Sequence, residues 1–187
     1  IKFIDRSVVS TDNRKIAKIA INSGLKFYSF RPKKLSGDRI SDTQVLLHAL
    51  KETEKKEKTK YDVVVMIQPT TPLRKAKDVI GAIRFLFKKN FDSVWTVSKS
   101  DLKYHPLKQL IIKKDKLNYY SKKGKFIIAR QQLNDIYYRN GVAYVIKAKF
   151  LKKNKKIIGN NTGAYLVKKE QISIDTIQDL KRVKKLY

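Results

Sequence analysis

The segment QPTTPLR, residues 68–74, has the residue types and spacing of an anion-binding loop. Its prolines restrict the backbone, its threonines and Gln68 supply hydrogen-bond donors and acceptors, and Arg74 supplies a fixed positive charge suited to phosphate or carboxylate. The alternative is a helix N-terminus, with Thr71 as the N-cap and Pro72 as the first helical residue. The two interpretations are compatible, because helix N-termini also favour anions.

A carboxylate, Asp175, stands in QISIDTIQDL, residues 171–180, where an alternating apolar pattern changes to a helical one. One interpretation makes Asp175 the N-cap of the following helix. The other makes it a ligand of a divalent cation beside phosphate groups, because Mg²⁺ prefers oxygen ligands of this kind. The residues alone leave both interpretations open.

A third polar cluster surrounds an apolar strand pattern in ARQQLNDIYYRNGVAYVI, residues 129–146. Its arginines, Arg130 and Arg139, and its amides, Gln131 and Asn140, are groups that recognise polar ligands. The alternative is a surface hairpin that turns at the Asn-Gly pair. The sequence does not decide between a recognition site and a hairpin.

The elements that must position these segments alternate between strands and helices in the first half of the chain. Apolar runs predict strands over 6–10, 25–30, 61–67 and 91–98, and helical periodicity predicts helices over 13–22, 43–58 and 75–90. This order predicts an α/β sheet, in which ligands bind beyond the carboxyl ends of the strands. The unbroken apolar run at 61–67 predicts a central parallel strand that is covered on both faces.

The pattern changes after Asp101. Residues 101–138 predict an antiparallel insertion that contains a hairpin with its turn at KKDK. A strand followed by a short turn is predicted over 140–150, another strand over 162–169, and a helix closes the chain. The length favours one domain.

Composition narrows the classes of partner and site. The formal net charge is +28, from 44 basic and 16 acidic residues, but the lysines occur in scattered pairs rather than in a stripe with aromatics, so nucleic-acid binding is the weaker hypothesis. The chain has no cysteine and two histidines, which excludes disulfides and histidine-rich metal sites. The longest apolar run, residues 63–67, is too short to span a bilayer, and the first residues carry no signal-peptide pattern. We expect a cytoplasmic protein without membrane contact.

Several short motifs occur in one fixed order along the chain. They are VVSTD (8–12), RPKKLSGD (31–38), LLHAL (46–50), QPTTPLR (68–74), HPLK (105–108), RQQL (130–133), YYRNGVAYVI (137–146), TGAY (162–165) and SIDT (173–176). In this order and spacing the chain resembles the acylneuraminate cytidylyltransferase family, the CMP-sialic acid synthetases and their bacterial relatives that act on pseudaminic or legionaminic acid. The resemblance covers nearly the whole chain.

The resemblance implies a nucleotide-diphospho-sugar transferase fold, a Rossmann-like three-layer α/β sheet with a small antiparallel dimerisation insertion. We therefore expect one cytidylyltransferase domain over residues 1–187, with the insertion at about 101–138. The implied reaction joins CMP from CTP to a nine-carbon α-keto acid sugar and releases pyrophosphate, with Mg²⁺ as the cofactor. The implied assembly is a homodimer.

The resemblance also implies roles for residues at matching positions. The nucleotide-binding residues would be Arg31, Gln68, Pro69, Thr70, Thr71 and Arg74. The sugar-binding residues would be Gln131, Tyr138, Arg139 and Asn140. Arg130 would be catalytic, with one of Arg130 and Gln131 supplied across a dimer. Asp175 would be catalytic and a metal ligand, as the second Asp of the family's Asp-x-Asp motif, with Ser173 at the position of the first.

Two features of the chain depart from the family pattern. The family's glycine-rich, basic phosphate loop has no counterpart, because the seven glycines are too dispersed to form one. We therefore expect a chain that starts downstream of that loop and of a first central strand. Ser173 would also bind a metal more weakly than a carboxylate. The alternative hypotheses are a truncated or degenerate, non-catalytic nucleotide- or sugar-binding relative and, less favoured, a basic nucleic-acid-binding protein.

Overall fold

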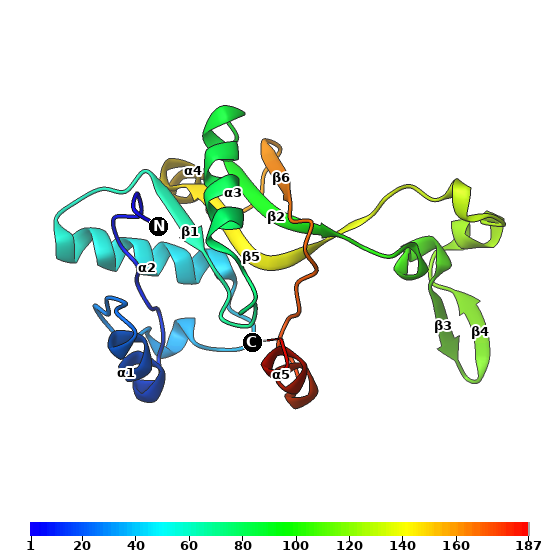
Figure 1. The fold of residues 1–187 in the computed structure, drawn as a ribbon, viewed down its shortest axis with the longest axis horizontal. Helices are drawn as coiled ribbons and strands as arrows, with labels where there is room; N and C mark the ends of the chain where they lie inside the picture. Colours follow the sequence, from blue (N-terminus) through cyan, green and yellow to red (C-terminus); the bar gives the residue numbers. More distant parts are fainter. Residues whose placement is uncertain (187) are drawn as a thin grey trace.

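A four-stranded mixed sheet with helices on both faces forms the centre of the molecule in a computed structural model that describes residues 1–186 (Figure 1). Its strands are β1 (Val63–Met66), β2 (Ser93–Lys99), β5 (Tyr137–Lys147) and β6 (Thr162–Leu166). A separate two-stranded sheet contains β3 (Leu110–Lys113) and β4 (Lys116–Tyr119). The α-helices are α1 (Arg14–Asn22), α2 (Asp42–Glu57), α3 (Ala76–Lys88), α4 (Ala148–Asn154) and α5 (Ile177–Lys184). Short 3₁₀ helices are η1 (Lys33–Leu35), η2 (Leu102–Tyr104), η3 (Pro106–Lys108), η4 (Lys122–Phe126) and η5 (Arg130–Gln132).

The strand order in the main sheet is β1-β5-β2-β6. β5 pairs antiparallel with both β1 and β2, and β2 pairs parallel with β6. β1, β2 and β6 therefore run in the same direction, so their carboxyl ends lie at one edge of the sheet together with the amino end of β5. The predicted place of β1 at the centre, with parallel neighbours, is wrong, because its one pairing in the described sheet is with the antiparallel β5.

Two apolar layers cover the sheet, and they explain why the run at β1 is unbroken. Val63 and Val65 pack on the side of α3, whereas Val64 and Met66 pack on the side of α2 and α4. An apolar run thus reports that both faces are covered, as predicted, but it does not report which strand is the neighbour. The most deeply buried side chains include Leu86, Val94, Val142, Val145, Ile146 and Leu151.

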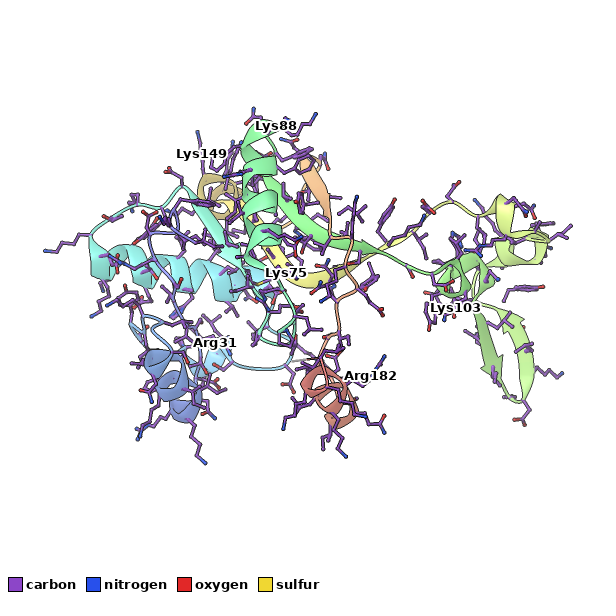
Figure 2. All side chains as sticks on the ribbon, in the orientation of Figure 1. Arg31, Lys75, Lys88, Lys103, Lys149 and Arg182 are labelled. Atoms are coloured by element: carbon purple, nitrogen blue, oxygen red, sulfur yellow. The ribbon has the colours of Figure 1, made fainter. Side chains whose placement is uncertain are left out.

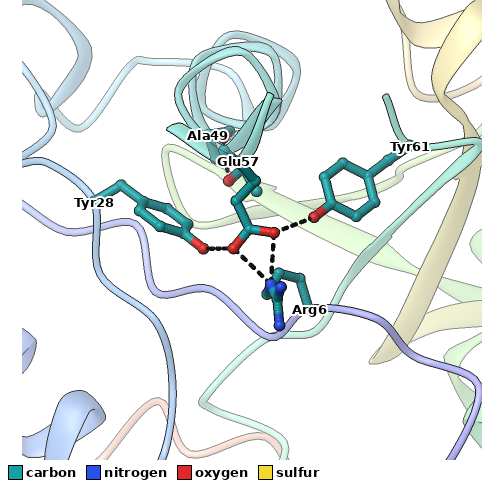
Figure 3. Close-up of polar contacts among 6 residues, drawn as sticks. Arg6, Tyr28, Ala49, Glu57 and Tyr61 are labelled. Atoms are coloured by element: carbon teal, nitrogen blue, oxygen red, sulfur yellow. Dashed lines mark hydrogen bonds and ion pairs between the residues drawn. The ribbon is translucent and has the colours of Figure 1, made fainter. Parts of the chain in front are cut away.

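The backbone pairing described for the N-terminal segment is internal to that segment. The strands predicted over 6–10 and 25–30 are reduced to one parallel bridge, Val8 with Lys26. A polar cluster attaches this segment to the end of α2: the Glu57 carboxylate accepts hydrogen bonds from Arg6 Nε (2.5 and 2.6 Å), from the Tyr61 hydroxyl (2.7 Å) and from the Tyr28 hydroxyl (Figure 3).

These contacts shift the titration of the Glu57 cluster. The guanidinium of Arg6, with the two tyrosine hydroxyls, lowers the pKa of Glu57 to about 2. Burial, together with the hydrogen bond to Glu57, raises the pKa of Tyr28 to about 12. The cluster therefore holds its charges over the whole physiological pH range.

Residues 101–136 form an arm that extends away from the sheet, at the right of Figure 1. Its β3–β4 hairpin turns at Lys114 and Asp115, which have φ of 47° and 60°, so the predicted turn at KKDK is confirmed. Every residue of β4 is exposed, and so are most residues of β3.

Two features near the C-terminus differ from the sequence prediction. The short turn expected near residue 150 is the helix α4, which packs Leu151 under α2. α5 begins at Ile177 with Thr176 as its N-cap, so Asp175 is not the cap. No helix of the described residues is both long and apolar enough to cross a membrane.

Candidate functional site

The segment 68–74 leaves the carboxyl end of β1 as a loop that is fixed by its own polar groups. The Arg74 guanidinium donates hydrogen bonds to the carbonyls of Gln68 and Thr71. Thr71 is 1% exposed, and its hydroxyl donates to the Asn140 carbonyl at 3.2 Å. The predicted N-cap role of Thr71 is wrong, because α3 starts only at Ala76 and has Lys75 as its N-cap.

The pair Asn140–Gly141 lies inside β5, directly against this loop. Gly141 has φ of +70°, and a Cβ at this position would lie 2.5 Å from Thr71 Oγ1 and 2.6 Å from Gln68 Oε1. The Gln68 N–H donates to the Gly141 carbonyl at 3.4 Å. Glycine is therefore required both for its backbone conformation and for the close approach of the loop. The interpretation of Asn-Gly as a hairpin turn is wrong, because β5 continues through it.

The segment 173–175 contacts the same loop. The Ile174 N–H donates to the Thr70 carbonyl at 2.8 Å, which ties the segment after β6 to the loop after β1. Asp175 and Ser173 are both exposed. Because Thr176 and Asp179 form the capping box of α5, the Asp175 carboxylate is not used as a helix cap.

The carboxylate of the capping box differs from that of Asp175. Asp179 accepts hydrogen bonds from the Thr176 hydroxyl at 2.7 Å and the Thr176 N–H at 2.9 Å, and the hydroxyl contact in particular lowers the pKa of Asp179. The Asp179 carboxylate therefore caps α5, whereas Asp175 is exposed in the segment next to the loop.

The oxygen atoms at Ser173 and Asp175 fit a Mg²⁺ ion only in one kind of site. Within residues 1–186 no three His, Cys, Asp or Glu side chains are grouped closely enough to hold a metal by themselves. Mg²⁺ often keeps several waters and takes one or two carboxylates together with substrate phosphates. One carboxylate and one hydroxyl at an exposed position fit such a site, with phosphate oxygens as the remaining ligands.

Arg31 lies in a second polar group, at the turn STD. Its N–H donates to the Thr11 carbonyl at 2.9 Å, and its guanidinium lies 3.6 Å from the Asp12 carboxylate and 3.4 Å from Ser36 Oγ. The motifs VVSTD and RPKKLSGD thus meet in space. The structure holds Arg31 with Asp12, and the described contacts do not link it to the loop after β1.

The residues predicted to bind the sugar fall into two places. Tyr138 and Arg139 are exposed at the amino end of β5, opposite Ser98 and Val97 of β2, and therefore at the same edge of the sheet as the loop. Arg130 and Gln131 are exposed on η5 of the arm. Figure 1 shows that the arm carries η5 away from the sheet.

Asn140 differs from its neighbours because it is buried, at 6% exposure. Its Oδ1 accepts hydrogen bonds from Thr96 Oγ1 at 2.7 Å and from the Val142 N–H at 3.1 Å. Its Nδ2 donates to Ser98 Oγ at 3.0 Å. The described contacts give this amide a role within the sheet, and its predicted contact with a sugar stays a prediction.

Sequence reasoning missed Thr96 and Ser98, which are 0% and 4% exposed. The signal was present, because hydroxyl residues recur in the otherwise apolar strand SVWTVS, and a buried hydroxyl needs a partner. The partner could not be identified, since it lies more than 40 positions further along the chain.

Comparisons with known proteins place the chain among nucleotidyltransferases. The family model described as "Cytidylyltransferase" matches residues 1–187. The chain is 29% identical to the post-translational flagellin modification protein B of Campylobacter coli, with 97% of this chain and 77% of that protein covered. It is 26% identical to the pseudaminic acid cytidylyltransferase of Campylobacter jejuni, with 98% and 78% covered.

A solved structure supports the fold alone. The CMP:2-keto-3-deoxy-manno-octonic acid synthetase complexed with CTP superimposes with a TM-score of 0.66 at 14% identity, covering 98% of this chain and 80% of that one. The predicted nucleotide-diphospho-sugar transferase type of α/β fold is thereby confirmed.

Proposed function

Because the chain belongs to the cytidylyltransferase family, we propose that it transfers CMP from CTP to a nine-carbon α-keto sugar acid and releases pyrophosphate. The names of the relatives support a sugar acid of the sialic, pseudaminic or legionaminic type. The observation that carries the proposal is the hydrogen bond between Ile174 N and the Thr70 carbonyl, since it joins the segment that contains the exposed Asp175 to the loop proposed to hold the nucleotide.

In the proposed reaction, the anomeric hydroxyl oxygen of the sugar forms a bond to the α-phosphorus of CTP. The bond from that phosphorus to the oxygen bridging to the β-phosphate breaks, pyrophosphate leaves, and the hydroxyl proton passes to solvent. The protein contributes orientation and charge neutralisation. Bound Mg²⁺ would neutralise phosphate charge, with Asp175 and Ser173 as its protein ligands.

We propose that different polar groups at the sheet edge bind the nucleotide and the sugar. We assign the nucleotide to the loop Gln68–Pro69–Thr70–Thr71, which Arg74 fixes through its carbonyl contacts, and to Arg31. We assign the sugar carboxylate and hydroxyls to Tyr138 and Arg139. Since all but Arg31 lie at the carboxyl ends of β1 and β6 or at the amino end of β5, this division follows the location of ligands in open α/β sheets.

The arm supports a homodimer as the working assembly. Large apolar side chains stand exposed along it, namely Leu110, Ile112, Leu117, Tyr119, Tyr120, Phe126 and Ile128. A protein surface with so many apolar residues marks an interaction site. We propose that a second copy covers them and that Arg130 and Gln131 of the arm reach the partner's sugar site. The enzyme would act in the cytoplasm.

A turnover assay tests the proposed function. The protein is mixed with CTP, Mg²⁺ and sialic, pseudaminic or legionaminic acid, and pyrophosphate release is followed. We expect release with at least one acid. Asp175→Ala should lower kcat at least 100-fold while the protein remains folded. Glu170→Gln, an exposed carboxylate of the same connecting segment, should stay within twofold of the parent. An active Asp175→Ala enzyme would remove the metal assignment.

Ser173 favours a second candidate, a relative that binds CTP without turnover. A hydroxyl is a weaker metal ligand than the carboxylate that the family pattern has at this position. Calorimetric titration with CTP and Mg²⁺ separates the two candidates, because binding without pyrophosphate release from any of the three acids supports the second. Turnover that appears only in Ser173→Asp would identify Ser173 as the cause.

A further inference from the structure

The pairing of β2 with β5 is interrupted at the edge of the sheet that carries the site. Trp95 of β2 pairs with Tyr144 of β5, and the next pair is Val97 with Arg139. One residue of β2, Thr96, therefore lies opposite four residues of β5, 140–143. The surplus residues of β5 bulge out of the ladder and include Asn140 and Gly141. A bulge leaves backbone groups without their ladder partners and re-aims the strand.

Thr96 is the residue of β2 that lies opposite this bulge, and its hydroxyl replaces the lost ladder contacts. Thr96 Oγ1 accepts a hydrogen bond from the Ala143 N–H at 2.9 Å. Its single hydroxyl proton is available to two oxygens, the Ala143 carbonyl at 2.9 Å and Asn140 Oδ1 at 2.7 Å. Because Thr96 is fully buried, water cannot substitute for any of these contacts.

Ser98 completes the arrangement from the next position on the same face of β2. It accepts from Asn140 Nδ2 at 3.0 Å and donates to the Val167 carbonyl at 3.3 Å, just beyond β6. The Asn140 side chain is therefore held from both ends of its amide by two hydroxyls of β2. This fixes the backbone of Asn140 and Gly141.

The backbone of the bulge in turn carries the loop after β1. The Asn140 carbonyl accepts from the buried Thr71 hydroxyl, and the Gly141 carbonyl accepts from the Gln68 N–H. The loop then holds the segment of Asp175 through the Thr70 carbonyl and Ile174 N–H. A continuous line of hydrogen bonds thus runs from Thr96, in the core, to the two segments of the candidate site.

We propose that Thr96 is a positioning residue of this site, which sets the loop 68–71 and the segment 173–175 through Asn140 without touching substrate. The inference rests on the proposed function for its kinetic part. A displacement of the order of 1 Å in groups that orient a substrate can cost about 100-fold in rate. The loss of one buried hydroxyl should therefore be visible in catalysis beyond its effect on stability.

The test uses Thr96→Val, which keeps the shape of the side chain and removes its hydrogen bonds. We expect kcat/KM for CTP to fall about 10- to 100-fold, mostly through kcat, and Thr96→Ser to restore most of it. Ser93→Ala is the matched control, because Ser93 is a fully buried hydroxyl of the same strand whose partner, Thr162 Oγ1 at 2.7 Å, lies far from the loop. Ser93→Ala should leave kcat within twofold.

Hydrogen exchange gives a reading that does not depend on turnover. In Thr96→Val, the amides of Thr71 and Ile174 should exchange faster than in the parent, whereas in Ser93→Ala they should not. Unchanged exchange at both amides, or equal kinetic losses in Thr96→Val and Ser93→Ala, would overturn the inference. A parent that releases no pyrophosphate but shows the expected exchange contradicts the proposed function and leaves the positioning role supported.

Discussion

The main sheet and the arm both contain paired strands, but the sheet buries its apolar residues and the arm exposes them. In β5, every residue from Asn140 to Ile146 is buried, and α3 covers one face of the sheet while α2 and α4 cover the other. In the arm, Ile112 is 74% exposed, Leu117 64% and Ile128 94%. The sheet therefore supplies its own core, and the arm carries apolar surface that its own residues leave uncovered. A two-stranded hairpin of this kind is marginal without further packing.

This difference suggests that the sheet region stabilises the fold and that the arm mediates assembly. The sheet and its helices should fold with little help from the arm, and the arm should depend on what covers it. Positive charge does not distinguish the sheet from the arm. Figure 2 shows labelled cations on separate elements, among them Lys88 on α3, Lys103 on the arm and Arg182 on α5.

The largest expected effect is a core truncation in the sheet region. Leu86 is a residue of α3 that is fully buried against the sheet. Leu86→Ala should therefore lower the free energy of unfolding by about 2–5 kcal/mol. Ile112→Ala, the matched truncation in the arm, should change it by about 0.5 kcal/mol or less in dilute protein. Urea denaturation of both variants measures the difference. Equal losses would mean that the arm has a core of its own.

The next largest effect concerns the proposed contact between the apolar residues of the arm and a second copy of the chain. Ile112→Lys should weaken the proposed homodimer about tenfold or more, because a charge would be buried against apolar surface. Phe87→Lys, at a 59% exposed apolar residue of α3, should leave association unchanged. Sedimentation over a range of concentrations measures both. A parent that is monomeric at every concentration, or a stronger effect from Phe87→Lys, would contradict the proposed interface.

The sequence predicts much of this fold because local patterns report burial and turns. The strands near 61–67 and 91–98, the three helices between 13 and 90 and the turn at KKDK all appear within a few residues of their predicted bounds. The location of 68–74 at the carboxyl end of a strand is also predicted, whereas its meeting with 173–175 is seen only in the structure, where β1 and β6 run in the same direction.

What the sequence could not predict depends on partners that are distant along the chain. The insertion of β5 between β1 and β2 is a pairing choice, and an apolar run such as 63–66 fits parallel and antiparallel neighbours equally. Asn140–Gly141 has the composition of a hairpin turn, and only its pairing with the distant strand β2 shows that it is a bulge within a strand, where the Thr96 hydroxyl binds the Asn140 side chain. Contacts of this kind decide which residues are exposed at the site.

The smallest effect tests the N-terminal segment, which resembles the arm in having few buried apolar residues but is attached by the Glu57 cluster. Glu57→Gln should lower the melting temperature at pH 7, because it removes the charge that Arg6, Tyr28 and Tyr61 bind.

The stabilisation by the Glu57 charge depends on pH. The folded pKa of about 2 is below the value of roughly 4.3 for an unfolded glutamate, so this stabilisation is present above pH 4 to 5 and is lost as the pH falls through 2. The difference in melting temperature between parent and Glu57→Gln should therefore shrink steadily from pH 5 to pH 2. Glu52→Gln is the control, because Glu52 lies five residues earlier on α2 and accepts a hydrogen bond from the Ser29 hydroxyl at 3.4 Å, and it should show a smaller difference. If the difference in melting temperature between parent and Glu57→Gln stays constant over this range, the cluster stabilises the protein through packing and not through charge. The N-terminal segment would then resemble the main sheet, which is held by packing.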